Sequence, residues 1–291
     1  MQDLIDKAAT LLEALPYIQR FRGATFVVKY GGSFMDSPDP AVRMGVARDI
    51  VFLEAVGINP VVVHGGGKAI SRTMKEEGLD PKFVQGHRVT DDASVEVVDR
   101  VLSNQINPEI VAALKDLGGG AVGIPGRDIL NCRQKVFTSP EGEPYNLGFV
   151  GEITSIDTDP ILRAIDQGMT PVISPTARGD DGQLFNCNAD LVATELAIAL
   201  KARRLVFMSD VPGLMKDPAK PESLISELSV KEVAKLKADS VIGEGMIPKI
   251  DSAVGAIQAG VKKVSLVDGR VNHAVLLEIF TDRGVGTQLF P

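Results

Sequence analysis

Short β-branched runs alternate along the chain with segments in which apolar residues recur at helical spacing. The runs that predict strands are 25–30, 60–64, 171–175, 204–209 and 264–267, and those that predict helices are 40–56, 68–77, 189–201, 230–236, 247–260 and 272–280. Nearly continuous apolar strands between amphipathic helices are typical of buried parallel strands. The pattern therefore predicts an α/β fold, a three-layer αβα sandwich around a central, mostly parallel sheet, in two lobes.

Two regions depart from this alternation. A long helical pattern over 91–117 ends at three glycines, and Pro108 marks a break or a second helix start inside it. Residues 121–153 change to short alternating runs separated by Gly and Pro, which predicts a β-hairpin excursion. The polar, turn-like stretch 178–182 predicts a lobe boundary, so that an arm of residues 1–23 precedes lobes 24–178 and 179–291.

The arm carries an apolar stripe at helical spacing. Its members are Leu4, Ile5, Ala8, Leu11, Leu12, Leu15 and Ile18, and we expect Pro16 to kink the helix. The stripe either folds back on the chain's own core or packs against another subunit. Its periodicity favours the two alternatives about equally.

Composition and charge exclude several classes of binding partner. With 291 residues, 44% apolar and 24% charged, the chain can bury a large core. A net charge of −7 argues against general binding to nucleic acids or acidic membranes. Cys132 and Cys187 are the only cysteines and lack metal-ligand spacing, which points away from a zinc site or a disulfide framework. Without a signal-peptide pattern or a spanning stretch, we expect a cytoplasmic protein with no membrane partner.

Two glycine-rich corners carry the first chemical signal. The segments 29–33 (Lys-Tyr-Gly-Gly-Ser) and 64–68 (His-Gly-Gly-Gly-Lys) each follow a predicted strand and lead towards a helix. Glycine lets the backbone approach an anion, and the N–H groups of loop and helix then bind it. Two such corners indicate an enzyme that holds a transferring phosphoryl group from both sides.

Familiar nucleotide motifs do not fit these corners. A P-loop requires an upstream glycine and a hydroxyl residue after the lysine, and Ala69 follows Lys68. A dinucleotide fingerprint requires a small residue where Ile70 stands, which leaves a Rossmann dehydrogenase as a weak alternative. The His-Arg-Asp and Asp-Phe-Gly motifs of protein kinases are absent from the sequence.

Six motifs in order resemble the amino acid kinase family. They are 28–33 (Val-Lys-Tyr-Gly-Gly-Ser), 63–67 (Val-His-Gly-Gly-Gly), 86–91 (Gly-His-Arg-Val-Thr-Asp), 186–190 (Asn-Cys-Asn-Ala-Asp), 209–214 (Ser-Asp-Val-Pro-Gly-Leu) and 245–249 (Gly-Met-Ile-Pro-Lys). The combination of the third and the fourth is similar to that of the branch that phosphorylates N-acetyl-L-glutamate in arginine biosynthesis. The resemblance extends from about Thr25 to the C-terminus.

The resemblance implies ATP and Mg²⁺ as cofactors, an amino-acid-binding first lobe and a nucleotide-binding second lobe. It implies catalytic roles for Lys29, Lys249 and Asp190, and substrate binding by Gly66, Gly67, Arg88, Asn186 and Asn188. It implies nucleotide binding by Gly31, Gly32, Ser209, Asp210, Val211, Pro212, Gly213, Leu214, Gly243 and Gly245. A carboxylate acceptor is already ionised at neutral pH, so the reaction requires charge neutralisation and positioning and no general base.

Each of these residues also has a structural interpretation. Asp190 is a candidate helix cap, which is compatible with a catalytic role, and Asn186 and Asn188 are candidate turn residues. Lys29 alone is typical of a solvated surface lysine, and Arg88 is a candidate structural ion-pair partner. The glycines that follow Lys29 and the fork of the Arg88 guanidinium favour the functional interpretation.

The arm, together with residues 278–287, resembles the arginine-inhibited hexameric members of the family. This implies an arginine effector bound near Tyr17, His273, Glu278 and Gly286. Two alternatives stay open: a kinase with another acceptor, such as glutamate, aspartate, carbamate or a nucleoside monophosphate, and a non-catalytic sensor of arginine or a nucleotide. Paired lysines around one aspartate argue against the sensor, which needs no cations around a phosphoryl group.

Overall fold

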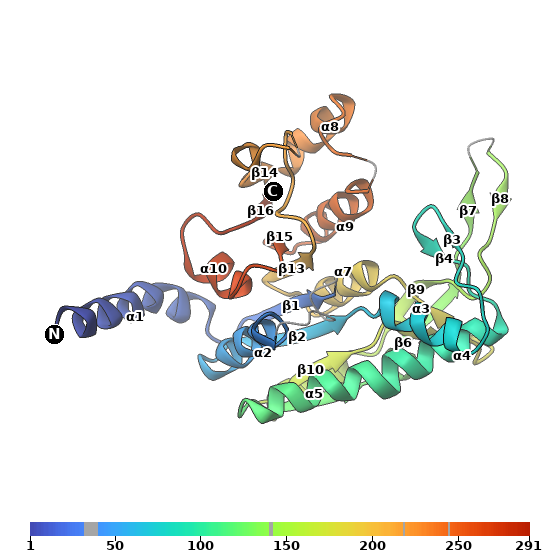
Figure 1. Ribbon diagram of the computed structural model, residues 1–291, viewed down its shortest axis with the longest axis horizontal. Coiled ribbons are helices and arrows are strands. Elements are labelled where there is room, and N and C mark those ends of the chain that lie inside the picture. Colours follow the sequence, from blue (N-terminus) through green and yellow to red (C-terminus); the bar gives the residue numbers. More distant parts are fainter. Residues whose placement is uncertain (32–39, 140–141, 218, 244) are drawn as a thin grey trace.

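A twisted eight-stranded sheet forms the centre of the protein (Figure 1). The computed structural model describes residues 1–31, 40–139, 142–217, 219–243 and 245–291. In spatial order the strands are β14 (Glu227–Ser229), β16 (Thr287–Phe290), β15 (Lys263–Asp268), β13 (Arg204–Ser209), β1 (Thr25–Tyr30), β2 (Asn59–His64), β10 (Thr170–Ile173) and β5 (Ala121–Ile124). Neighbouring strands run parallel except β15 and β16, which confirms the predicted mostly parallel sheet.

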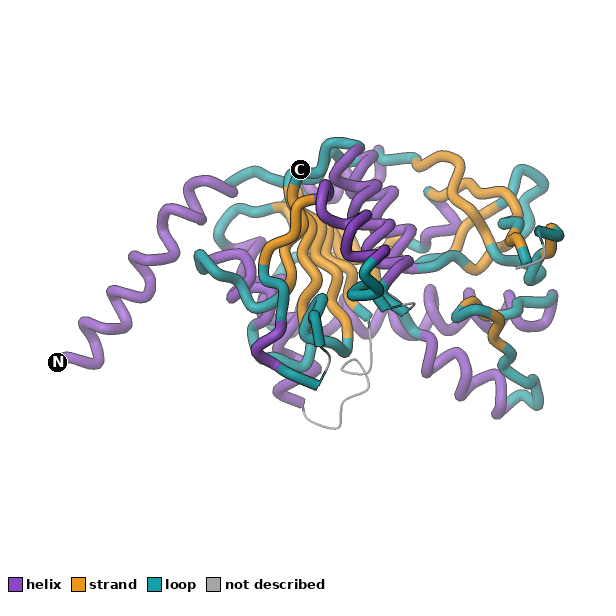
Figure 2. Tube along the Cα trace, turned by 90° about the horizontal axis from the view of Figure 1, so that it is seen from above, coloured by secondary structure: helices purple, strands orange, loops and turns teal. Residues whose placement is uncertain are grey.

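Helices cover both faces of this sheet, as a three-layer sandwich requires (Figure 2). One face packs against α6 (Asp159–Asp166), α7 (Ala189–Ala199) and α9 (Ile247–Gln258), with α8 (Val230–Ala238) near the β14 edge. The other packs against α2 (Pro40–Ala55), α3 (Gly67–Glu76), α4 (Asp92–Val101), α5 (Asn107–Asp116) and α10 (Ala274–Phe280). The predicted layer order is therefore confirmed.

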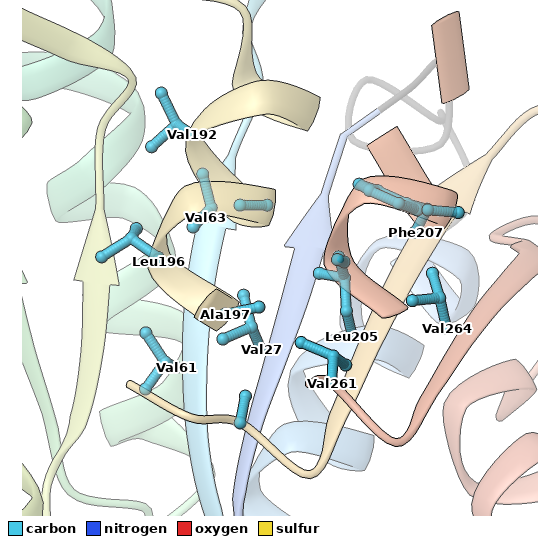
Figure 3. Close-up of a cluster of buried hydrophobic side chains, with 14 of the residues drawn as sticks. Val27, Val61, Val63, Val192, Leu196, Ala197, Leu205, Phe207, Val261 and Val264 are labelled. Carbon is cyan, nitrogen blue, oxygen red and sulfur yellow. The ribbon is translucent and has the colours of Figure 1, made fainter. Parts of the chain in front are cut away.

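Strand β1 shows why the sequence reads as a continuous apolar run. Val27 belongs to the cluster on the α7 and α9 face (Figure 3), whereas Phe26 and Val28 belong to the cluster on the opposite face. All three side chains are fully buried, each contributing roughly 1.5–3 kcal/mol relative to an exposed position. Because successive side chains point to opposite faces, a strand covered on both faces must be apolar at every position.

The predicted excursion over 121–153 divides between two sheets. Its first strand, β5, is an edge of the large sheet, and the rest forms one short hairpin and contributes two strands to a second four-stranded sheet. The second sheet consists of β12 (Leu184–Asn186), β11 (Thr176–Arg178), β6 (Leu130–Gln134) and β9 (Gly151–Ile156), and the hairpins of β3 (Phe83–Val84) with β4 (His87–Arg88) and β7 (Phe137–Thr138) with β8 (Pro144–Tyr145).

The predicted lobe boundary at 178–182 falls in the turn between β11 and β12. The Gly179 N–H donates to the carbonyl of Gln183 at 2.9 Å across this turn. The large sheet takes strands from both sides of the boundary, because β1 pairs with β2 and with β13. The division into lobes stays a prediction.

Helix α1 (Gln2–Phe21) projects away from the sandwich (Figures 1 and 2). It continues through Pro16 as one helix, although the proline removes one backbone N–H from the helical hydrogen bonds. Its C-terminal end packs through Tyr17 and Phe21 against the body of the chain. The exposed apolar face of α1 consists of Leu4, Ile5, Leu11, Leu12 and Leu15, which are 42–69% exposed. This face does not fold back on the chain's own core.

The long helical pattern over 91–117 forms three segments. A π-helical turn, Leu102–Ile106, separates α4 from α5, and Pro108 lies in the first turn of α5, where a missing N–H costs little. Of the break or second helix start predicted at Pro108, the structure has the second: α5 starts at Asn107, and the chain stays helical through the π turn before it. The π turn itself has no signature in the sequence.

Candidate active site

The two glycine corners and the end of β13 meet at one edge of the large sheet. Strand β1 pairs in parallel with both β2 and β13, so the carboxyl ends of all three lie together. The Gly65 N–H donates to the carbonyl of Tyr30 at 2.9 Å, which joins the two corners. The β1 corner is described only up to Gly31, so Gly32 and Ser33 lie outside the described residues.

Lys29, Lys249 and Asp190 converge in this edge from three different elements. Lys29 is on β1, Asp190 in the first turn of α7 and Lys249 in the first turn of α9. The Lys29 Nζ lies 3.0 Å from Asp190 Oδ1, and the Lys249 Nζ donates a hydrogen bond to Asp190 Oδ2. The side chains of the three residues are only 12–20% exposed. One carboxylate thus holds two ammonium groups, and the cluster keeps one net positive charge.

The electrostatics of the cluster keep Asp190 ionised. Burial favours the neutral carboxyl, but the charges of Lys29 and Lys249 outweigh burial and hold the pKa of Asp190 below its usual value. The sequence suggested Asp190 as the cap of α7, and this prediction is wrong. Asn188 is the cap, because its Oδ1 accepts from the N–H groups of Asp190 at 2.8 Å and Leu191 at 3.3 Å. Capping by Asn188 leaves the Asp190 carboxylate free for the lysines.

A cavity of about 240 Å³ lies on one side of this cluster. Its lining includes Lys29, Asp190 and all five residues predicted to bind substrate: Gly66, Gly67, Arg88, Asn186 and Asn188. The N-terminus of α3, where backbone N–H groups lack helical acceptors, forms part of the wall. We call this the acceptor cavity.

Arg88 is a buried cation on the wall of the acceptor cavity. Its side chain donates to the carbonyl of Gly67 at 2.9 Å and to Ser71 Oγ at 2.8 Å, and it lies over the ring of Phe83. None of the ion pairs among the described residues includes Arg88. Burial lowers the pKa of its guanidinium. A charge held without a carboxylate partner favours an anionic ligand.

A second cavity, of about 460 Å³, also borders Lys29. It is lined by Lys29, Lys249, Gly31, Ser209, Asp210, Val211, Gly243, Gly245 and Met246. Lys29 is common to both cavities, so a group passing between them meets an ammonium on the way. We call this the donor cavity.

Of the described residues predicted to bind nucleotide, three are not part of the donor cavity lining. Leu214 is 2% exposed and packs in the hydrophobic core. Gly213 has φ +142° and makes a tight approach to Thr287, where an added Cβ would lie 2.6 Å from the hydroxyl oxygen. Pro212 precedes this turn. The 209–214 motif therefore divides into a cavity-lining half and a structural half.

A metal ion has few fixed ligands here. The described residues contain no group of three His, Cys, Asp or Glu side chains that could hold one. Asp190 is engaged by two lysines, and Asp210 is the carboxylate that lines the donor cavity. This donor set fits a Mg²⁺ bound mainly by nucleotide phosphates, as is usual for that ion.

The structure adds residues that sequence reasoning missed. Phe83 and His87 belong to the acceptor cavity lining through the β3–β4 hairpin, and Met246 lines the donor cavity. His87 packs edge to face on Phe137 of the second hairpin. Short irregular hairpins carry little periodicity, so only the position of Gly86-His87-Arg88 within the motif could have signalled them.

The predicted effector residues lie at the other end of the sheet, around α10. Glu278 is fully buried, and its Oε2 accepts from the N–H groups of Val285 at 2.9 Å and Gly286 at 3.3 Å. Its Oε1 is buried without a hydrogen-bond partner among the described residues. Tyr17 packs against Phe280 of the same helix. His273 lies at the opposite end of α10, with Nδ1 2.7 Å from an oxygen of Asp49.

Comparison with known proteins fits this geometry. The family model described as "Amino acid kinase family" matches residues 24–268. The chain belongs to the amino acid kinase family. It is 45% identical to the acetylglutamate kinase of Carboxydothermus hydrogenoformans over 100% of both chains, and 47% identical to that of Geobacter metallireducens over 99% of both.

Solved structures of the N-acetylglutamate synthase from Neisseria gonorrhoeae share the fold. The complex with coenzyme A and N-acetyl-glutamate has a TM-score of 0.83 at 26% identity, covering 98% of this chain and 63% of the synthase chain. The complex with coenzyme A and L-arginine has a TM-score of 0.78 at 26% identity, covering 97% and 65%. Across the described residues, no helix is long and apolar enough to cross a membrane.

Proposed function

We propose that this protein is an acetylglutamate kinase, which transfers the γ-phosphoryl group of ATP to the side-chain carboxylate of N-acetyl-L-glutamate. The observation that carries the proposal is the Lys29–Asp190–Lys249 cluster between two cavities. Full-length relatives named as acetylglutamate kinases support the choice of acceptor over glutamate, aspartate, carbamate or a nucleoside monophosphate.

The cluster suits a reaction between two anions. The acceptor carboxylate is ionised at neutral pH and attacks phosphorus directly, and the bond from phosphorus to the bridging oxygen of ADP breaks. Lys29 and Lys249 neutralise charge on the phosphoryl group in transit, while Asp190 keeps both ammonium groups in place. Mg²⁺, bound with the nucleotide, supplies further positive charge at the outer phosphates.

The acceptor cavity fits the remaining groups of N-acetyl-L-glutamate. We assign the α-carboxylate to Arg88, whose guanidinium has no carboxylate partner among the described residues. We assign the acetylated nitrogen and its carbonyl to Asn186 and Asn188, whose amides both donate and accept. Asn188 Oδ1 already caps α7, so its Nδ2 is the group left for a ligand. Gly66 and Gly67, which also line this cavity, supply backbone N–H groups for the transition state.

A substrate panel tests the proposal directly. Coupled ADP release is measured with N-acetyl-L-glutamate and with unacetylated L-glutamate at equal concentrations. A site built to bind the acetyl amide rejects the analogue that lacks it, and we expect kcat/KM to be at least about 100-fold lower with glutamate. Equal turnover of both, or turnover of neither, would refute the proposal.

We further propose that arginine inhibits the enzyme by binding around Glu278. Two polar atoms without hydrogen-bond partners are buried in this region, Glu278 Oε1 and Arg204 Nη1, and the charge of Glu278 acts on Arg204. A guanidinium donates to the first and a carboxylate accepts from the second, and arginine carries both groups. Tyr17 and Gly286 border the region. His273 bonds to Asp49 at the other end of α10, so we assign it an indirect role, through the position of that helix.

The exposed apolar face of α1 supports a homo-oligomer, a hexamer by family resemblance, in which this face packs on another subunit.

The two cysteines, Cys132 and Cys187, are both buried free thiols. Free thiols fit the reducing cytoplasm, where we place the protein.

A further inference from the structure

His64 is a fully buried residue that the proposed chemistry does not use. It ends β2 and immediately precedes the three glycines that border the acceptor cavity. Its Nδ1 lies 2.9 Å from the carbonyl oxygen of Gly65, and its Nε2 lies 3.2 Å from Asn107 Nδ2. Asn107 Nδ2 also donates to the carbonyl of Val172 at 2.8 Å. His64 is thus bonded on both sides of its ring.

These partners fix the tautomer of His64. A carbonyl oxygen only accepts, so Nδ1 carries the hydrogen that binds Gly65, and an amide nitrogen only donates, so Nε2 is the acceptor for Asn107. Burial lowers the pKa of His64 to about 4, although the bond to Gly65 acts in the opposite direction. The ring is therefore neutral at physiological pH and has no proton to exchange with substrate.

The bond from His64 sets the orientation of the next peptide unit. In a trans peptide the C=O and the following N–H point in opposite directions, and no peptide bond among the described residues is cis. With the Gly65 carbonyl held on the His64 side, the Gly66 N–H points the other way. Gly66 precedes α3 as its N-cap, so its N–H has no helical acceptor, and it lines the acceptor cavity with Lys29 and Asp190.

The π-helical turn holds the same peptide from a second direction. At Gly66 a Cβ would lie 2.5 Å from Ile106 Cδ1 and 2.7 Å from Leu102 Cδ2, so both side chains pack directly on the glycine. Both belong to the π turn, and Asn107, the partner of His64, follows it. π turns are frequent at functional sites. Here one turn fixes the peptide by packing and, through Asn107, by hydrogen bonding.

We propose that His64 and Asn107 are positioning residues that hold the Gly65–Gly66 peptide so that the Gly66 N–H is aimed at the phosphoryl group in transit. This inference rests on the proposed kinase activity. A donor aimed where charge develops acts on the transition state more than on bound substrate. Its loss therefore lowers kcat and leaves the KM of either substrate nearly unchanged.

Two substitutions of His64 separate positioning from packing. His64→Leu fills most of the buried space but has no donor for Gly65. His64→Asn leaves more of the space empty, yet its amide nitrogen stands where Nδ1 stands and keeps the donor. If His64 acts only by packing, His64→Asn should lose more kcat than His64→Leu. If it positions the peptide, His64→Leu should lose more kcat than His64→Asn.

The experiment measures kcat, both KM values and the melting temperature of the wild type and both variants, with Asn107→Leu as a further variant should His64→Leu fail to fold. We expect kcat to fall roughly 10- to 100-fold in His64→Leu, to stay within about fivefold in His64→Asn, and to fall about 3- to 10-fold in Asn107→Leu, with KM within about threefold throughout. For these three variants the fall in kcat will not follow the melting temperature.

Full activity of His64→Leu, or equal losses of kcat in both His64 variants, would overturn the positioning role while the kinase activity of the wild type stood. If His64→Leu does not fold, full activity of Asn107→Leu overturns it. A wild type that turns over no N-acetyl-L-glutamate would instead remove the proposed function, and this inference with it.

Discussion

Asp190 and Glu278 are both buried carboxylates at opposite ends of the fold, and their partners differ. Asp190 has an ammonium group beside each oxygen: Lys249 donates a hydrogen bond to Oδ2, and Lys29 lies 3.0 Å from Oδ1 as an ion pair, although Oδ1 accepts no hydrogen bond among the described residues. Glu278 is compensated on one oxygen by two backbone N–H groups, and its other oxygen has no partner among the described residues. The first carboxylate therefore has its cations in place before any ligand binds, whereas the second forms no ion pair among the described residues.

This difference indicates two functions: catalysis at Asp190 and binding of a cationic ligand at Glu278. A complete charge cluster is preorganised, so it lowers a barrier without rearranging during the reaction. An incomplete one gains a partner only when a cation binds, and the burial of its orphan oxygen makes that binding selective for a donor. We therefore expect the same carboxylate-to-amide substitution to have opposite consequences at the two positions.

The largest expected effect is at Asp190. Asp190→Asn removes the charge that holds two ammonium groups together, and the lysines then repel each other. We expect kcat with N-acetyl-L-glutamate to fall about 100- to 1,000-fold in the coupled assay. Asp251→Asn, which disrupts a surface ion pair with Lys237, is the matched control and should change kcat by less than about twofold. An active Asp190→Asn enzyme would remove the distinction between the two carboxylates.

The second largest effect is on the free energy of unfolding, and it arises from the protonation of His64. Its pKa is about 4 in the folded chain, whereas an unperturbed histidine, as in the unfolded chain, has a pKa of 6.5. The unfolded chain thus binds a proton that the folded chain refuses, and this stabilisation is complete above pH 6.5 and is lost as the pH falls towards 4. The stability advantage of the wild type over His64→Asn should shrink by about 2–3 kcal/mol between roughly pH 7 and pH 4.5.

Urea unfolding of the two proteins at both pH values measures that change. Because the other titrating groups are common to wild type and variant, their contributions cancel in the difference. A difference that does not depend on pH would mean that His64 binds a proton as readily in the folded state as in the unfolded chain, which contradicts a lowered pKa.

Glu278→Gln keeps an acceptor for Val285 and Gly286 and loses only the negative charge. We expect the concentration of L-arginine that halves activity to rise roughly 10- to 100-fold, since a hydrogen bond to a charged group contributes about 1.5–3 kcal/mol. Activity without arginine should be unchanged, in contrast to Asp190→Asn. Glu227→Gln on an exposed position of β14 serves as control. Undiminished inhibition would place the effector elsewhere.

The smallest change in unfolding free energy is expected for substitutions on α1. Leu11→Ser and Leu12→Ser remove apolar side chains that are 69% and 66% exposed, so the unfolding free energy of the chain should change by less than about 0.5 kcal/mol. The molar mass from light scattering should nevertheless fall, because the exposed face would lose its contact with another subunit. An unchanged mass for the double variant would assign the α1 face another role.

Much of the fold could be predicted because burial on both faces of the sheet leaves a direct trace in sequence. The strand at 204–209 and the helix at 189–201 were found within two residues by apolar pattern alone. Strands β14 and β16 were not predicted, since strands of three and four residues have too few positions to show a period.

The site divides in the same way. Lys29 and its glycines could be found from local sequence, because a phosphate cradle is a local backbone geometry. The convergence of Lys249 on Asp190 joins residues 59 positions apart, and only the family resemblance indicated it. Asn107 escaped notice because its role depends on a π turn and on the buried ring of His64, neither of which has a sequence pattern.

The most direct test is a single-turnover measurement of phosphoryl transfer by Lys249→Ala with ATP and N-acetyl-L-glutamate both saturating, alongside calorimetric Kd values for each ligand. The account predicts a transfer rate about 100- to 1,000-fold below that of the wild type, with both Kd values within about threefold, because the ammonium group acts on the phosphoryl group in transit. An unchanged transfer rate, or a loss explained entirely by weaker ligand binding, would contradict it.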